Sequence, residues 1–194
     1  MTGQPHATGA APVAGCLLLA TPVIAEPTFF RTVVLLLEHD DAVGSLGVVL
    51  NRPMELTVAD TLPAWAGLTS PPGVLFAGGP VAEGSALALG RVTTTDPLPA
   101  GVTSVFGPLA VVDLDTEVSV AGSVVGELRL YRGYAGWGPG QLRNELRSQA
   151  WWVLPSLPGD WFSTDPSELW YRVLGRQGGS WAMWAHAAED PEVN

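Results

Sequence analysis

The chain opens with three apolar runs of strand length. Residues 15–21 and 31–39 are rich in leucine and β-branched side chains, and residues 45–51 form a third run after an acidic, glycine-containing turn. The stretches Leu17–Leu19 and Val33–Leu37 are continuously apolar, which is typical of strands covered on both faces. The pattern therefore predicts three strands, the first two of them at the centre of a sheet.

The rest of the chain holds shorter strand and helix patterns. Further strands are expected at residues 74–77, 86–92, 109–113, 123–131 and 151–154. Helices are expected at residues 57–68, where Pro63 would bend or divide the segment, at residues 139–149, and from a capping box that starts at Asp165. This order of strands and helices predicts an α+β fold with one domain.

A glycine-rich segment, Gly133–Leu142, places four glycines around Tyr134 and Trp137 just ahead of an expected helix. Glycine tolerates positive φ and lets another group approach the main chain closely. We interpret the segment as a shaped loop against which the two aromatic side chains pack.

The charge balance limits the classes of partner. All nine basic residues are arginine and are dispersed from Arg31 to Arg176, whereas nineteen residues are acidic, giving a net charge of −10. Duplex binding and attraction to anionic membranes both depend on clustered cations. We therefore expect no direct binding to nucleic acid and no association with a membrane.

The single cysteine, Cys16, excludes an internal disulfide. Val13–Cys16 looks like a lipoprotein cleavage box, but the residues ahead of it lack the positive charge and apolar run of a signal peptide. We therefore expect a cytoplasmic protein with Cys16 buried and unlipidated. The expected organisation is a disordered tail over residues 1–12, a domain over residues 13–178, and a partly flexible tail over residues 179–194.

Several short segments carry a resemblance to a known family. They are, in order, Gly15–Pro22, Phe30–Val34 with Glu38–His39, Gly47–Pro53, Gly78–Pro80 and Gly133–Leu142. On these segments the chain resembles the YqgE/AlgH family of bacterial proteins over about residues 15–178. It departs from that pattern at Leu89–Gly90, where many relatives place a histidine after the leucine.

The resemblance implies a fold more than an activity. The family fold is a mixed, bifurcated sheet with a small barrel-like closure surrounded by helices, in agreement with the α+β pattern. Members are described as uncharacterised or as candidate transcriptional regulators, without an established catalytic set. We therefore expect a non-catalytic ligand- or protein-binding module that needs no cofactor and affects transcription indirectly.

Glu38–Asp41 is the densest cluster of candidate metal ligands and acid–base groups. In a strand, Glu38 and Asp40 would point to one face and His39 to the other, so these neighbours cannot converge on one ion. We expect a solvated turn here and no metal site.

A small-molecule hydrolase is the alternative function. It would use a cleft near His39 and Asn51, with Ser45 or Cys16 as candidate nucleophile. The spacing alone brings neither nucleophile to His39.

Three turn-like segments at the ends of expected strands are predicted to converge on one concave surface. The residues expected to line it are Asn51, Arg52, Gly78, Gly79, Tyr134, Trp137, Gly138, Gly140 and Gln141. Arg52 would supply charge, and the amides at the start of the following helix would suit an anion. The expected partner is an unknown protein or a small anionic ligand. The alternative is that the glycines only let the aromatic residues pack against the sheet.

The tryptophans divide into two groups. Trp137, Trp151, Trp161 and Trp170 lie at element ends and are expected in the core. Trp181 and Trp184 lie beyond the last expected helix, so this apolar tail either folds back on the body or meets a partner.

Overall fold

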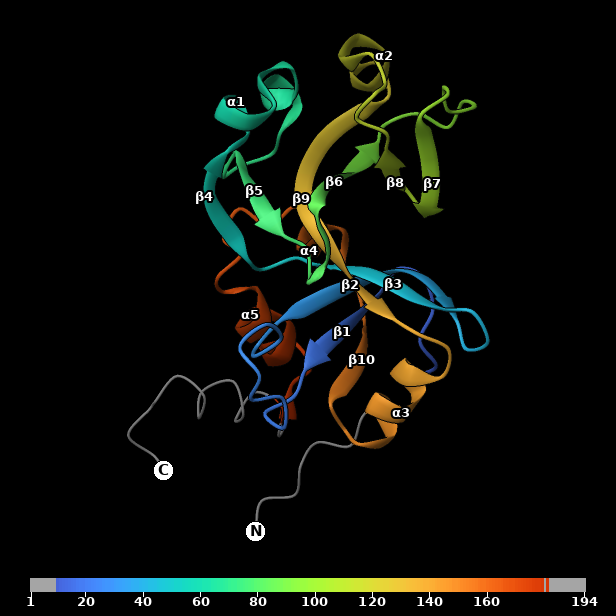
Figure 1. Cartoon of the computed structure of the whole chain (residues 1–194), viewed down its shortest axis with the longest axis vertical. Coiled ribbons are helices and arrows are strands. Elements are labelled where there is room, and N and C mark those ends of the chain that lie inside the picture. The colour runs from blue at the N-terminus through green and yellow to red at the C-terminus, as the bar shows by residue number, and fades with distance from the viewer. Residues whose placement is uncertain (1–9, 180, 182–194) are drawn as a thin grey trace.

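The computed structural model describes residues 10–179 and residue 181. Within these residues a curled, mostly antiparallel half-barrel sheet is flanked by short helices (Figure 1). The strands are β1 (Cys16–Ala20), β2 (Val33–Asp40), β3 (Gly44–Val49), β4 (Pro53–Thr57), β5 (Val74–Ala77), β6 (Val81–Val92), β7 (Val102–Phe106), β8 (Leu109–Val112), β9 (Val125–Trp137) and β10 (Trp151–Pro155). The helices are α1 (Val58–Thr61), the 3-10 helix η1 (Pro63–Leu68), α2 (Val118–Gly122), α3 (Gln141–Arg147), α4 (Pro158–Trp161) and α5 (Leu169–Gly175).

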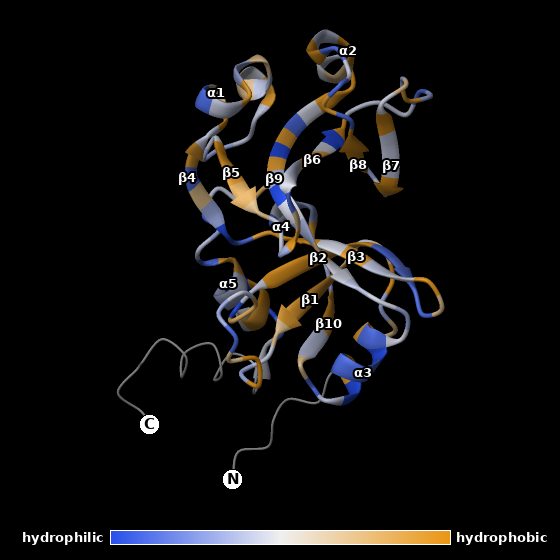
Figure 2. Ribbon diagram, viewed as in Figure 1, coloured by the Kyte–Doolittle hydropathy of each residue, from blue (hydrophilic) through white to orange (hydrophobic). Residues whose placement is uncertain are grey.

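The main path through the sheet runs β10-β1-β2-β3-β9-β6-β8-β7, while β4 pairs with β5 and β5 pairs in parallel with β9. The burial on both faces predicted for the first two strands is confirmed, although they lie second and third from the β10 edge and not at the centre of the sheet. Residues 17–20 of β1 and 33–36 of β2 have no exposed surface, and both strands stand out as apolar in Figure 2. The predicted α+β class is confirmed as well.

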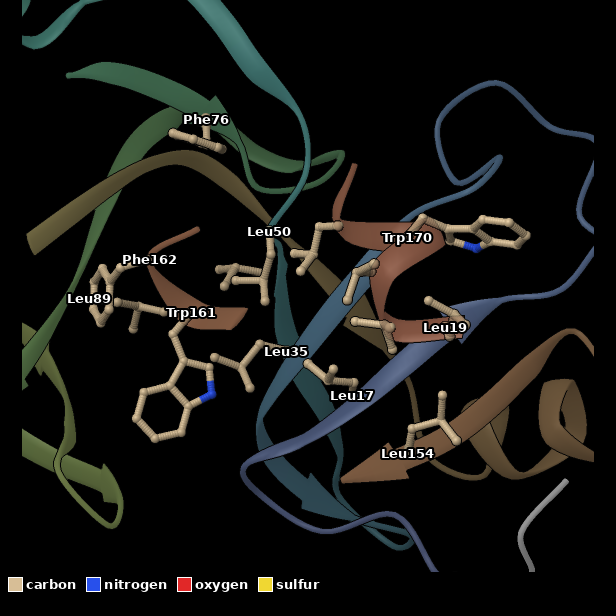
Figure 3. Packing of buried hydrophobic residues seen from close by; sticks show 14 of the residues in the cluster. Leu17, Leu19, Leu35, Leu50, Phe76, Leu89, Leu154, Trp161, Phe162 and Trp170 are labelled. Atoms are coloured by element: carbon tan, nitrogen blue, oxygen red, sulfur yellow. The ribbon is translucent and has the colours of Figure 1, made fainter. Parts of the chain in front are cut away.

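The largest core cluster lies between the sheet and helices α4 and α5. Figure 3 shows Leu17, Leu35 and Trp161 pointing into this common interior. Trp137, Trp151, Trp161 and Trp170 are each no more than 6% exposed, which confirms their predicted core positions. Apolar burial of this kind is the dominant favourable contribution to folding.

At the N-terminal end of the fold the predicted burial of Cys16 is confirmed, since this residue is 8% exposed in β1. Trp181 folds back on the body, with its ring 4.8 Å from that of Trp152, centroid to centroid. Most of the predicted tails, and Trp184 with them, lie outside the described residues.

The main error of the sequence prediction concerns the glycine-rich segment. Residues 133–137 are not a loop but the last five residues of β9, which is thirteen residues long. Figure 1 shows β9 running from the half of the molecule that carries α1 and α2 into the half that carries α3. The glycines do not interrupt the strand because the neighbouring segments hydrogen-bond to it along this length: Val81 pairs with Tyr134, and Ser45–Gly47 pair with Ala135–Trp137.

The helix predictions were partly right. The segment 57–68 is divided at Pro63 into α1 and η1, as its proline predicts. The capping box at Asp165 is wrong, because α5 begins only at Leu169 and the Asp165 carboxylate instead accepts a hydrogen bond from the Ser167 hydroxyl at 2.8 Å. Strands β4 and β7 and the short helices α2 and α4 were missed; each is only four or five residues long.

Candidate functional site

The three segments predicted to converge do meet, in a tightly packed backbone junction. The Ala77 amide donates to the Arg52 carbonyl, the Val49 amide to the Gly78 carbonyl, and the Gly78 amide to the Arg132 carbonyl, each at 2.9 Å. A Cβ on Gly78 would clash with the Gly133 carbonyl oxygen. The glycines at this junction therefore permit main-chain contact and leave no space between the segments.

Asn51 and Arg52 are engaged in holding the chain ahead of β2. The Asn51 side chain is 3% exposed; it accepts from the Val33 amide and donates to the Arg31 carbonyl, both at 2.9 Å. Arg52 donates to the Phe30 carbonyl, and burial lowers the pKa of its guanidinium. Both side chains have internal structural partners.

The other end of the predicted surface forms a network around Glu145. One carboxylate oxygen accepts from the indole nitrogens of Trp137 and Trp151, at 2.8 Å each, and the other accepts from the Gln141 side chain at 2.9 Å. Glu145 did not emerge from the sequence, because nothing in its spacing indicates that two distant tryptophans meet on one face of α3.

The amides proposed for an anion are already occupied. The Gly138 amide donates to the Gln141 side chain, the Gly140 amide to the Asp41 carbonyl, and the Gln141 amide to the Gly138 carbonyl, all at 3.0 Å. The chain itself satisfies all three donors, so these amides are not free to bind the anion that the sequence led us to expect.

An open cavity of about 400 Å³ lies beside this network, and we refer to it as the β3–β9 cavity. It is lined by Glu38, Val43, Gly44, Ser45, Leu46, Val81, Tyr134, Gly136 and Trp137. The lining includes Tyr134 and Trp137 of the predicted surface but not Asn51, Arg52, Gly78, Gly79, Gly138, Gly140 or Gln141.

The strand register explains the shape of this cavity. Glu38 of β2 lies opposite Leu46 of β3, and Leu46 lies opposite Gly136 of β9, so the three residues form a row across one face of the sheet. A Cβ on Gly136 would lie 3.4 Å from Val81 Cγ2 and 3.5 Å from Tyr134 Cε2. The missing side chain at Gly136 therefore leaves a depression bordered by Val81 and Tyr134.

The cavity has an acidic rim. Glu38 carries the only charge among its lining residues and is exposed. Arg143 of α3 does not line the cavity, and its guanidinium pairs with the Asp41 carboxylate at 3.5 Å. The electrostatics of the lining thus suit a neutral or cationic group better than an anion.

His39 and Ser45 pair across the same hairpin. Their pair is next to the pair of Glu38 and Leu46 in the strand register. His39 Nδ1 lies 2.8 Å from Ser45 Oγ. Alternation along a strand directs this pair to the opposite face from Glu38, as the sequence predicts. Asn51 hydrogen-bonds to Val33, at the other end of β2 from His39. Val33 and His39 are six residues apart, which is about 20 Å at the usual rise of a strand. Asn51 therefore does not share a cleft with His39.

A second cavity, of about 300 Å³, lies between α1, β5 and the start of β6. Its lining includes Leu62, Leu75, Glu83 and Arg132. Arg132 donates to the Glu83 carbonyl at 2.6 Å, so its charge is held at the wall of this cavity. Among the described residues there is no group of three or more His, Cys, Asp or Glu side chains placed to hold a metal ion.

Arg129 is a buried cation whose hydrogen-bond acceptors among the described residues are backbone carbonyls. Its side chain is fully buried in β9 and donates to the carbonyls of Pro71 and Ser163, at 2.8 Å each. Its guanidinium carbon also lies 4.3 Å from the centre of the Phe76 ring. Burial lowers the pKa of Arg129, and these contacts make it a cross-link between β9 and two connecting segments.

Comparison with known proteins decides the family. The family model described as AlgH-like (DUF179) matches residues 17–182, which is most of the chain. This chain belongs to the AlgH-like family. The match confirms the resemblance seen in the five sequence segments.

Relatives with similar sequences occur in bacteria. A UPF0301 protein of Streptomyces avermitilis is 48% identical over 183 residues, which cover 93% of this chain and 94% of that protein. A UPF0301 protein of Mycobacterium tuberculosis is 45% identical over 166 residues, which cover 84% of this chain and 82% of the relative.

Two solved structures share the AlgH-like fold. Protein DIP2367 from Corynebacterium diphtheriae superposes with a TM-score of 0.85 at 28% identity, covering 91% of this chain and 93% of that one. The solution structure of the AlgH protein from Pseudomonas aeruginosa gives a TM-score of 0.68 at 27% identity, covering 95% and 96%. No helix in the described part of this AlgH-like chain is long and apolar enough to cross a membrane.

Proposed function

We propose that this AlgH-like protein acts by binding a ligand in the β3–β9 cavity, without catalysis. The observation that carries the proposal is the cavity itself, whose volume of about 400 Å³ lies within the range of small-molecule sites. Its apolar and aromatic wall with few polar groups is the lining that such sites usually have.

The proposed setting is the cytoplasm, and the proposed effect on transcription is indirect. The buried thiol of Cys16 supports a compartment in which no disulfide is needed, and burial raises its pKa, which keeps it unreactive. The net charge of −10 supports a regulator that acts through another molecule, because direct DNA binding needs exposed cations.

A titration followed by amide resonances tests the proposed site. Neutral, cationic and anionic probes of four to eight heavy atoms are added separately, and the amides of Gly44, Leu46, Tyr134 and Gly136 are followed. We expect at least one class of probe to shift these amides together and saturably. If no probe of any charge shifts them at millimolar concentration, the cavity is not a ligand site.

The contact between His39 and Ser45 favours hydrolysis as a second candidate function. With Nδ1 2.8 Å from Oγ, a neutral His39 can take the hydroxyl proton as Ser45 attacks an acyl carbon. Which ring nitrogen carries the proton is a choice of tautomer, and this mechanism requires Nδ1 to be the free one.

A fluorophosphonate probe tests this candidate. Hydrolysis by the pair predicts one covalent adduct on the intact protein, lost in Ser45→Ala and in His39→Ala but retained in Ser119→Ala, which changes an exposed serine on α2. Absence of any adduct after prolonged exposure to the probe would remove the candidate.

A further inference from the structure

The carboxylate at the rim of the β3–β9 cavity has no partner in the described part of the chain. Glu38 is exposed, and no hydrogen bond or ion pair joins its side chain to another described residue. Its neighbours differ in this respect: Asp40 accepts from the amides of Ala42 and Val43, and Asp41 pairs with Arg143. Glu38 is therefore the acidic group of this hairpin that remains available to a ligand.

The groups next to Glu38 complement a cation on an apolar stem. Leu46 and Gly136 continue the row that Glu38 begins, with Val81 and Tyr134 at its far side. A cation near Glu38 would gain an ion pair, its alkyl stem would lie along Leu46 and Val81, and the Tyr134 ring offers a π face. No lining residue carries a positive charge that would oppose this arrangement.

We propose that the β3–β9 cavity takes an alkylguanidinium or alkylammonium group. This inference rests on the proposed binding function and specifies the ligand class for the same site. The shared chemistry can come from a free small molecule or from an arginine or lysine side chain of a peptide. An anionic ligand does not fit, because the only charge in the lining is negative and the nearby amides are occupied.

Three probes of similar shape and different charge test the ligand class on the full-length protein. They are n-butylguanidinium, the neutral isostere N-butylurea and the anion valerate. We expect n-butylguanidinium to shift the amides of Leu46, Tyr134 and Gly136 with a dissociation constant at least threefold below that of N-butylurea. Higher salt should reduce this preference, because an exposed ion pair is screened.

Substitutions of Glu38 and Gly136 separate the contribution of the charge to binding from that of the apolar depression. Glu38→Gln should weaken n-butylguanidinium roughly two- to fivefold, as expected for an exposed ion pair, and leave N-butylurea unchanged. Glu55→Gln, on the exposed face of β4, is the matched control. Gly136→Val should abolish the binding of both probes because the new side chain fills the depression between Val81 and Tyr134.

The variant Gly136→Val should still fold. Its Cβ makes ordinary contacts at 3.4 Å and 3.5 Å, and valine suits a strand better than glycine. Gly67→Val on η1, where nothing lies within 4 Å of the new Cβ, is the matched control and should bind as the wild type does.

The outcomes distinguish the inference from the proposed function. Preference for N-butylurea or valerate overturns the cationic ligand but keeps a binding site, whereas no shift with any probe overturns both. A Glu38→Gln variant with undiminished preference for n-butylguanidinium also overturns the inference. An N-acetylarginine amide arm identifies the source: binding as tight as that of n-butylguanidinium indicates that a peptide side chain can occupy the site, and loss of binding indicates a free small molecule.

Discussion

At the scale of single residues, several polar side chains of the signature segments bind the chain itself. The Glu145 carboxylate accepts from the indole groups of Trp137 and Trp151. The Asn51 side chain accepts from the Val33 amide and donates to the Arg31 carbonyl, as a neighbouring strand would. These interactions are local solutions to burying polar groups, since a buried donor without an acceptor costs about 1–3 kcal/mol.

Replacement of Glu145 tests how much its network stabilises the fold. Glu145→Ala leaves two indole N–H groups without their acceptor and should lower the free energy of unfolding by about 2 kcal/mol, the usual worth of bonds to a charged group. Urea denaturation followed by tryptophan fluorescence measures the change. Glu145→Gln keeps an acceptor oxygen and should lose less, and Glu55→Ala should lose under about 0.5 kcal/mol. A loss that small in Glu145→Ala would contradict the role of the network.

The buried hydroxyl of Tyr131 should make the stability of the folded protein depend on pH. Burial raises the pKa of its hydroxyl well above the ordinary value of 10.0, and the buried oxygen has no partner among the described residues. As pH rises past 10, unfolded chains lose this proton while the folded protein keeps it, so stability falls. Burial of Cys16 acts in the same direction from about pH 9.

Tyr131→Phe isolates this contribution. Below pH 10 the variant should be as stable as the wild type or slightly more so, because it removes a buried polar atom without a partner. Between pH 9 and 11 its stability should fall less steeply than that of the wild type. Urea unfolding at several pH values measures both effects, and parallel curves for the two proteins would argue against a buried, protonated Tyr131.

At the scale of secondary structure, the sequence predicted the strands that consist of continuously apolar residues. The apolar runs of β1 and β2 predicted strands buried on both faces, because full burial shows directly as continuous apolar sequence. Length alone did not decide the outcome, because β5 and β8 have only four residues each and were predicted from their continuous apolar sequence. Strand β4 and helix α4 were missed because their four or five residues mix apolar and polar side chains with proline and are too short to show a period.

The glycine-rich end of β9 could not be recognised as a strand for a different reason. Glycine weakens a strand taken alone, and only the tertiary neighbours show that close backbone approach is required there. For the same reason the sequence did not locate the cavity. The three segments meet in backbone contacts without a concave surface between them, whereas the cavity depends on Glu38, Leu46 and Val81, which cross-strand register brings beside Tyr134.

Gly79 tests the junction between β5, β6 and β9. Its φ is 148°, and a Cβ there would clash with the backbone of Tyr134 and Ala135, which no rotation of a side chain can relieve. Gly79→Ala should therefore cost at least about 2 kcal/mol. Gly84→Ala, with nothing within 4 Å of the new Cβ, is the control. Thermal unfolding midpoints compare the two, and equal midpoints would show that the junction has room to adjust.

At the scale of the whole molecule, charge is distributed so that most arginines serve the fold. Arg91 pairs with Glu127, Arg176 pairs with Asp160 at 2.7 Å, and Arg129 is buried. Few cations are left to form a surface that could displace counterions from a nucleic acid.

We therefore expect no specific duplex binding by the isolated protein. At physiological salt, fluorescence anisotropy of labelled duplexes should show no saturation at micromolar protein, in line with the net charge of −10. Affinity below one micromolar that depends on DNA sequence would contradict an indirect role in transcription.

The passage of β9 through both halves of the molecule also bears on cooperativity. One continuous strand pairs with β6 in one half and with β3 in the other, and it contacts β5 between them. Opening either half would expose hydrogen-bonding groups of the same strand, so the two halves are expected to lose their structure together. Slowly exchanging amides should then extend along β9 from Leu128 to Ala135 with similar opening free energies, and the chain should unfold as a single unit despite its two-part outline.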